Sequence, residues 1–142
     1  MATAFRQAVV ADIPSLMEIR LDVRENRLDD PTKVTYELVV DHLERRGRGW
    51  LCEEDGRAVG FAIADRATWS IWALFLRPEA EGRGIGRALL RLAVDWLFAA
   101  GAPQVTLSTG VGTRADGFYA AQGWERGGRN ADGEVVFTLR RP

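Results

Sequence analysis

The chain has little of several features that define common classes of protein. It has one cysteine, Cys52, so the sequence excludes an internal disulfide and any zinc site built from several cysteines. Its 19 basic and 20 acidic residues give a net charge of −1, which offers no electrostatic basis for binding nucleic acid or an anionic membrane. No apolar run is long enough to span a membrane, and the N-terminus lacks a basic-then-apolar signal pattern. We therefore expect a cytoplasmic protein.

The composition is typical of a folded domain. Of the 142 residues, 46% are hydrophobic, and five tryptophans and six phenylalanines supply large side chains for a core. No repeat, linker or low-complexity segment interrupts the chain. We expect residues 1–142 to form a single domain, with Cys52 as a packed strand residue.

A cluster of glycines separates an apolar run at 69–76 from an amphipathic segment. Gly82, Gly84 and Gly86 stand at every second position, which lets successive backbone N–H groups converge without interference from Cβ atoms. The start of a helix adds the positive end of its dipole. This order of strand, loop and helix predicts a binding site for the phosphates of a ligand.

Two common nucleotide-binding motifs do not fit this loop. A dinucleotide fingerprint requires a third glycine where Arg87 stands, and no acidic residue near Gly101 could bind a ribose. A Walker loop requires Gly-Lys-Ser/Thr, and no such tripeptide occurs. The phosphate site therefore belongs to another class.

The loop resembles the pyrophosphate loop of the GCN5-related N-acetyltransferases (GNAT), whose pattern is Arg/Gln-x-x-Gly-x-Gly/Ala. Residues 84–86 match it, with Glu81 where Arg or Gln is usual. A second segment, 114–124, is similar to that family's Asn-x-x-Ala-x-x-Phe-Tyr-x-x-x-Gly-Phe pattern, with Trp124 in place of the last Phe. The first position of the pattern, usually Asn, falls just before this segment, at Gly112. The two signatures stand at the separation that the family shows.

Local patterns predict the element order β-α-α-β-β-β-α-β-α-β-β. Strands are expected at 5–10, 49–53, 57–64, 70–76, 104–109, 124–126 and 135–140. Helices are expected from Asp12, from Thr35 to Gly47, at 85–100 and at 114–122. The resemblance implies that these elements form an α/β (α+β mixed) acyl-CoA N-acyltransferase fold, a mixed but mostly antiparallel central sheet of about seven strands with helices on both faces.

The sequence pattern predicts which side chains face inward in the strand at 70–76 and in the helix at 85–100. Alternation along 70–76 groups Ile71, Ala73 and Phe75 on one face and Trp72, Leu74 and Leu76 on the other, so this strand should be central and covered by helices. Helical periodicity predicts one inward face for the segment that follows the glycines, made of Ile85, Leu89, Leu92, Ala93, Trp96 and Ala100.

The resemblance implies an acyltransferase that moves the acetyl group of acetyl-CoA to a primary amine by direct attack in a ternary complex. The cofactor is expected to bind residues of the central strand and the glycine loop, namely Leu74, Phe75, Leu76, Glu81, Gly82, Arg83, Gly84, Ile85, Gly86 and Arg87. Because Glu81 stands where Arg or Gln is usual, the loop lacks a positive charge there, which Arg83 or Arg87 can supply. No metal is expected.

Tyr119 is the expected general acid, because a phenol with a pKa of about 10 can protonate a leaving thiolate and the resemblance places it there. The other interpretation is a buried aromatic residue. Neither 69–76 nor 104–110 contains a carboxylate, so the sequence does not assign the base. A water relay from Asp22, Glu25 or Asp65 is one way in which a base could act.

The acceptor is expected to be a small-molecule or peptide amine, with no nucleic-acid or membrane partner, and a homodimer is left open. The expected pocket residues are Arg24, Glu25, Asn26, Trp72, Ser108 and Thr109. His42 is expected to be a solvated helix residue. Two other functions fit the same sequence: a non-catalytic acetyl-CoA or CoA sensor, and a structural domain whose glycines only form turns.

Overall fold

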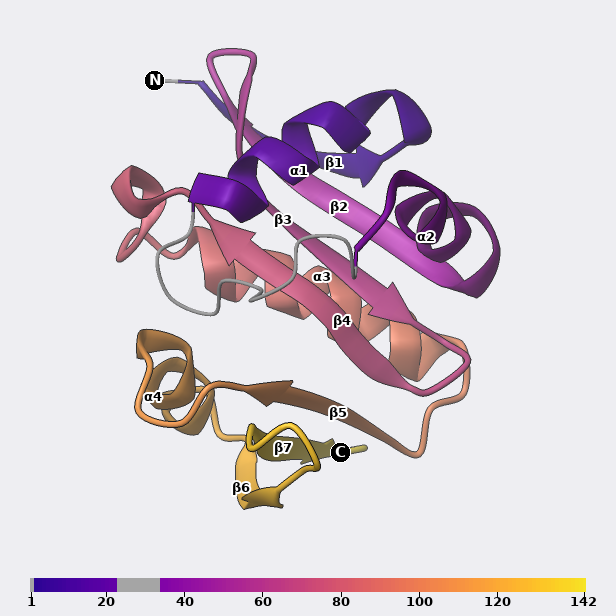
Figure 1. The fold of residues 1–142 in the computed structure, drawn as a ribbon, viewed down its shortest axis with the longest axis vertical. Helices are drawn as coiled ribbons and strands as arrows, with labels where there is room; N and C mark the ends of the chain where they lie inside the picture. The colour runs from indigo at the N-terminus through magenta and orange to yellow at the C-terminus, as the bar shows by residue number, and fades with distance from the viewer. Residues whose placement is uncertain (1, 23–33) are drawn as a thin grey trace.

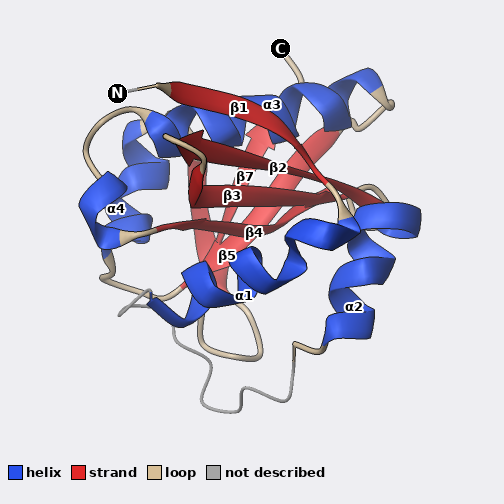
Figure 2. Ribbon diagram, turned by 90° about the horizontal axis from the view of Figure 1, so that it is seen from above, coloured by secondary structure: helices blue, strands red, loops and turns tan. Residues whose placement is uncertain are grey.

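The computed structural model describes residues 2–22 and 34–142, which form a central sheet with helices on both faces (Figures 1 and 2). The strands are β1 (Thr3–Ala8), β2 (Gly47–Glu54), β3 (Arg57–Asp65), β4 (Ser70–Leu76), β5 (Gln104–Thr109), β6 (Glu125–Arg129) and β7 (Val135–Arg140). The α-helices are α1 (Ile13–Asp22), α2 (Tyr36–Asp41), α3 (Ile85–Ala99) and α4 (Arg114–Ala121). The predicted order is confirmed, although β1 ends before Val9 because Val10–Asp12 forms a 3-10 turn.

The described strands form one sheet in the order β1-β2-β3-β4-β5-β7-β6. Every neighbouring pair is antiparallel except β4 and β5, which are parallel. These two strands share a single residue pair, Ser70 with Thr106, and diverge beyond it (Figure 1). Within the described residues, the edge of β4 that faces β5 therefore has no ladder partner from Ile71 to Leu76.

Two hydrophobic clusters hold the helices against the sheet. Helix α3 covers one face, and α1 and α2 cover the other (Figure 2).

Capping and turn residues determine where some of these elements begin and how they are connected. The Thr35 side chain accepts a hydrogen bond from the Leu38 N–H at 3.2 Å and caps α2. Asp55 and Gly56 both have positive φ, as a two-residue turn between β2 and β3 requires.

The buried face of α3 differs from the prediction. Leu92 and Ala100 are exposed, whereas Leu90, Val94 and Leu97 are buried. The inward residues lie in two adjacent rows spaced by four, because the helix rests on a broad sheet and buries a wide strip. Periodicity does not set how the helix is rotated about its axis on the sheet, and this rotation decides which residues lie at the centre of the buried strip.

Strand β4 contains a β-bulge at Trp72 that simple alternation does not predict. Ile71 and Ala73 pair with adjacent residues of β3, so Trp72 is an extra residue between them. Ile71 packs in the α3 cluster, whereas Ala73 and Phe75 pack in the cluster under α1 and α2. The predicted grouping of these three residues on one face is therefore wrong. The prediction of a central strand covered by helices is confirmed.

Candidate active site

A cavity of about 650 Å³ lies between the end of β4, the start of α3 and α4. Its lining consists of Leu74, Phe75, Leu76, Pro78, Glu81, Gly82, Gly84, Gly86, Arg87, Arg114, Ala115, Phe118, Tyr119 and Gln122. The cavity therefore gathers the predicted cofactor-binding residues except Arg83 and Ile85. The Ile85 side chain is buried in the cluster beneath α3.

The first turn of α3 opens onto this cavity. Gly84 is the N-cap, with φ of 84° and ψ of 0°, a left-handed conformation that favours glycine. Its carbonyl accepts the first helical hydrogen bond, from Ala88, so the N–H groups of residues 85–87 precede the helical ladder. These donors and the helix dipole make the turn suited to an anion.

Charged side chains on this loop are arranged in pairs. Arg114 Nε lies 2.7 Å from Glu81 Oε2, so an arginine from α4 neutralises the acidic residue that stands where the family pattern has Arg or Gln. Arg83 forms an ion pair with Glu54 of β2 and is not part of the cavity lining. Arg87 lines the cavity directly. With Arg87 and Arg114 against Glu81, the charged lining is net positive.

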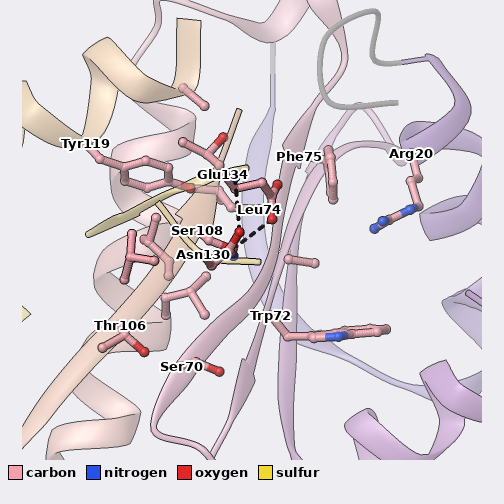
Figure 3. Close-up of a pocket in the computed structure, with 16 residues that line it drawn as sticks. Arg20, Ser70, Trp72, Leu74, Phe75, Thr106, Ser108, Tyr119, Asn130 and Glu134 are labelled. Carbon is pink, nitrogen blue, oxygen red and sulfur yellow. Dashed lines mark hydrogen bonds between the residues drawn. The ribbon is translucent and has the colours of Figure 1, made fainter. Parts of the chain in front are cut away.

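A second cavity of about 440 Å³ occupies the gap where β4 and β5 diverge (Figure 3). Residues from α1, β4, β5, α4 and the β6–β7 hairpin line it, and they include the predicted Trp72, Ser108 and Thr109. Leu74, Phe75, Ala115 and Tyr119 line both cavities. The two cavities therefore meet at these four residues, between the unpaired edge of β4 and helix α4.

Tyr119 lies at this junction with its ring held among other aromatic rings. Its centroid is 5.2 Å from Phe118, 5.9 Å from Trp124 and 5.7 Å from Phe137. Burial raises the pKa of Tyr119 above its usual value, because apolar surroundings disfavour the phenolate. The hydroxyl is therefore protonated at neutral pH. Both interpretations made from the sequence, a buried aromatic and a proton donor, fit this environment.

Asp116 fixes the start of α4, the helix that carries Tyr119. Its carboxylate accepts the Gly112 N–H at 2.9 Å and two hydrogen bonds from Arg126, at 3.0 and 3.1 Å. The Arg126 guanidinium holds the pKa of Asp116 below its usual range. Gly112, which stands where the family pattern has Asn, thus uses its backbone to anchor the turn before the helix.

Glu134 is a carboxylate in the second cavity that the sequence analysis missed. Its Oε1 accepts a hydrogen bond from Ser108 Oγ at 3.0 Å, and its N–H donates to Asn130 Oδ1 at 3.0 Å (Figure 3). The available signal was its place directly before β7, the strand that pairs with β5. Neither 69–76 nor 104–110 includes that neighbouring strand.

Two of the carboxylates named for the base, Asp22 and Asp65, do not line either cavity. Asp65 is buried and pairs with Arg46 at 2.9 Å. Asp22 lies 3.5 Å from Arg77. The predicted pocket residues Arg24, Glu25 and Asn26 lie outside the residues that the structure describes.

His42 is buried, so the prediction of a solvated residue is wrong. A π-helical turn at His42–Arg46 continues α2 and turns the imidazole inward. The ring stacks on Trp72 with centroids 3.7 Å apart, Nδ1 lies 2.8 Å from the Leu38 carbonyl oxygen, and Nε2 lies 3.4 Å from Asp65 Oδ2. His42 therefore supports Trp72, which lines the second cavity.

Comparison with known proteins identifies the family and agrees with the fold. The acetyltransferase (GNAT) family matches residues 13–124, and the chain belongs to this family. In the described part of the chain, no helix is long and apolar enough to cross a membrane. No group of three or more His, Cys, Asp or Glu residues there is placed to hold a metal ion.

Individual relatives act on different acceptors. A mycothiol acetyltransferase of Beutenbergia cavernae is 38% identical over 81 residues, which are 53% of this chain and 27% of that protein. The peptidyl-lysine N-acetyltransferase YiaC of Escherichia coli is 29% identical over 94 residues, 61% of each chain. This chain thus spans only part of the length of both relatives.

A solved structure extends the likeness over the whole chain. The PaiA N-acetyltransferase of Thermoplasma acidophilum, solved in complex with coenzyme A, superposes with a TM-score of 0.84 over 99% of this chain and 100% of that one. At 15% sequence identity this similarity shows a shared fold.

Proposed function

We propose that this protein transfers the acetyl group of acetyl-CoA to a primary amine by direct attack in a ternary complex. The observation that carries the proposal is the meeting of two cavities at Leu74, Phe75, Ala115 and Tyr119. A thioester entering from one cavity and an amine entering from the other would react there. Holding both reactants together replaces a bimolecular collision with an effectively unimolecular step.

Acetyl-CoA would occupy the larger cavity. Its pyrophosphate would bind the first-turn N–H groups of α3, which carry the positive end of the helix dipole. Its pantetheine arm would hydrogen-bond the edge of β4 at Leu74–Leu76, where β5 has diverged. A backbone N–H on this edge would also stabilise the oxyanion that forms when the amine attacks.

The chemistry requires one proton to leave the amine and one to reach the sulfur. The amine nitrogen attacks the thioester carbonyl carbon, and the carbon–sulfur bond of the tetrahedral intermediate then breaks. We assign Tyr119 as the donor of a proton to the departing thiolate, because its hydroxyl stays protonated at neutral pH. We assign Glu134 as the carboxylate that attracts the acceptor ammonium and receives its proton, directly or through water.

Loss of an arginine beside the phosphates is expected to weaken CoA binding more at low salt than at high salt. Salt screens exposed charge contacts, so Arg87→Ala and Arg114→Ala should each lower affinity by about threefold to tenfold at low ionic strength, with a smaller loss at 0.5 M salt, where the Debye length is only about 4 Å. Titration calorimetry with CoA at both salt concentrations measures this effect.

Arg83→Ala is the matched control, because Arg83 is on the same loop but pairs with Glu54. The sequence placed Arg83 among the phosphate contacts, whereas the cavity lining favours Arg87 and Arg114. A larger loss for Arg83→Ala than for the other two variants would restore the original assignment.

The activity itself is tested by incubating the protein with acetyl-CoA and a panel of small and peptide amines, and by measuring free CoA together with the acetylated amine. We expect CoA release that depends on a particular amine and matches its acetylation in amount. Tight binding of acetyl-CoA without acetylation of any amine would favour a sensor. Failure to bind acetyl-CoA would favour a structural domain.

A further inference from the structure

Arg20 brings a positive charge to the second cavity, and no ion pair joins it to a carboxylate among the described residues. It lies on α1 and lines that cavity from the face opposite α3 (Figure 3). The Arg20 guanidinium carbon lies 4.7 Å from the centroid of the Phe75 ring. Stacking occupies the flat face of the guanidinium and leaves the N–H groups on its edge available.

Hydrogen bonding at Arg20 is incomplete. Among the described residues, Arg20 Nε is the one buried side-chain nitrogen or oxygen without a hydrogen-bond partner. Burial lowers the pKa of Arg20 from its usual value, which reflects the cost of holding this charge away from water. An arginine remains protonated in spite of such a shift, so a ligand anion would relieve an existing cost.

Acidic residues on the same helix do not neutralise Arg20. Glu18 Oε1 lies 2.9 Å from Arg77 Nη2, and Asp22 Oδ2 lies 3.5 Å from Arg77 Nη1. Both carboxylates are therefore drawn to an arginine at the end of β4. The carboxylate in the second cavity, that of Glu134, accepts a hydrogen bond from Ser108 instead.

We propose that Arg20 binds a carboxylate of the acceptor, so that the acceptor of the proposed acetyl transfer is a small amino acid, which carries both an amine and a carboxylate. This inference rests on the proposed function. The cavity has one cationic side chain, Arg20, and one anionic side chain, Glu134, among its described lining residues. A zwitterion would direct its carboxylate to Arg20 and its amine to Glu134 and Tyr119.

The shape and walls of the cavity support this class of ligand. A volume of about 440 Å³ is in the range of small-molecule sites. Trp72, Phe75 and Val136 provide apolar surface for the carbon skeleton. The planar, forked guanidinium matches a carboxylate, which can accept two parallel hydrogen bonds. Repulsion from Glu134 would disfavour the reversed orientation, in which the carboxylate approaches the thioester.

The test uses pairs of probes that differ only in the carboxylate. These are straight-chain ω-amino acids from glycine to 6-aminohexanoate and the common L-α-amino acids, each paired with its own carboxamide. Their affinity for the CoA-bound protein is measured by calorimetry, and their kcat/KM with acetyl-CoA is measured by CoA release. We expect at least one acid to exceed its amide by about tenfold to a hundredfold, the usual effect of a hydrogen bond to a charged group.

Three variants assign that preference to Arg20. Arg20→Gln should reduce it to about twofold or less, and Arg20→Lys should keep part of it because the charge remains but the fork is lost. Arg91→Gln is the matched control on α3, where the Arg91 side chain is 79% exposed and pairs with Asp95 at 3.7 Å. It should behave as the wild type does. An unchanged melting-temperature rise with acetyl-CoA verifies that each variant is folded.

The possible outcomes separate the two proposals. If no acid binds better than its amide, or if Arg20→Gln keeps the preference, the role of Arg20 is overturned even where amines are acetylated. If acids bind through Arg20 but none is acetylated, the carboxylate site stands and the acetyl transfer to amino acids fails.

Discussion

Replacing Tyr119 by phenylalanine is expected to lower kcat by about 10²–10⁴-fold, the usual contribution of a general acid, provided that proton transfer limits the rate. The ring would keep its contacts with Phe118, Trp124 and Phe137, so stability and KM for acetyl-CoA should change little. Steady-state kinetics with an accepted amine measures the loss. Tyr36→Phe, which removes the hydroxyl of the other tyrosine, 52% exposed on α2, is the control.

The pH dependence of kcat, measured for the wild type and for Tyr119→Phe, provides a second test of this role. Because burial raises the pKa of Tyr119, the phenol of the folded enzyme should stay protonated up to and above about pH 10. The wild-type kcat should therefore show no decrease from phenol ionisation between pH 6 and about pH 10. Full turnover by Tyr119→Phe across that range would leave Tyr119 as a packing residue only.

Replacing Gly84 by valine is expected to remove nearly all of the stabilisation that acetyl-CoA gives. In the wild type, ligand at about 100 times Kd adds about 2.7 kcal/mol. That gain corresponds to a rise in melting temperature of roughly 5–10 °C for a domain of this size. A Cβ at φ of 84° strains the N-cap of α3, and a branched side chain would stand where the first-turn N–H groups meet the phosphates. Thermal unfolding with and without acetyl-CoA measures both effects.

Gly101→Val separates backbone strain from loss of the site. Gly101 follows the other end of α3 with φ of 108°, and a Cβ there meets no atom within 4 Å, as at Gly84. This variant should lose stability in a similar way but keep the full rise with acetyl-CoA. A folded Gly84→Val protein with an undiminished rise would place the phosphates elsewhere.

Local chemistry made the loop and the element order predictable. Three signals act over a few residues: the glycines at 82–86, the cap at Thr35 and the turn at Asp55–Gly56. Each depends on backbone conformations that particular residue types favour. For the same reason, the predicted cofactor residues from β4 and the loop, except Arg83 and Ile85, fall together in one cavity, since they follow one another along the chain.

Non-local pairing decided what local patterns could not. The bulge at Trp72 arises from the register between β3 and β4, and it redirects the side chains on both sides. The inward face of α3 depends on how the helix rests on the sheet. His42 is buried because a π-helical turn brings it against Trp72 and Asp65, which lie on two other strands.

The family resemblance, the order of the elements and the glycine loop before α3 could be predicted from the sequence alone, because these follow from residue type, spacing and short-range backbone preference. The way in which the second cavity is assembled depends on the tertiary structure. Arg20 of α1, Trp72 of β4 and Glu134 of the β6–β7 hairpin are far apart in the chain, and they meet where β4 and β5 diverge. Their convergence depends on strand order and register, which arise from the packing of the whole sheet and have no signature in any short segment.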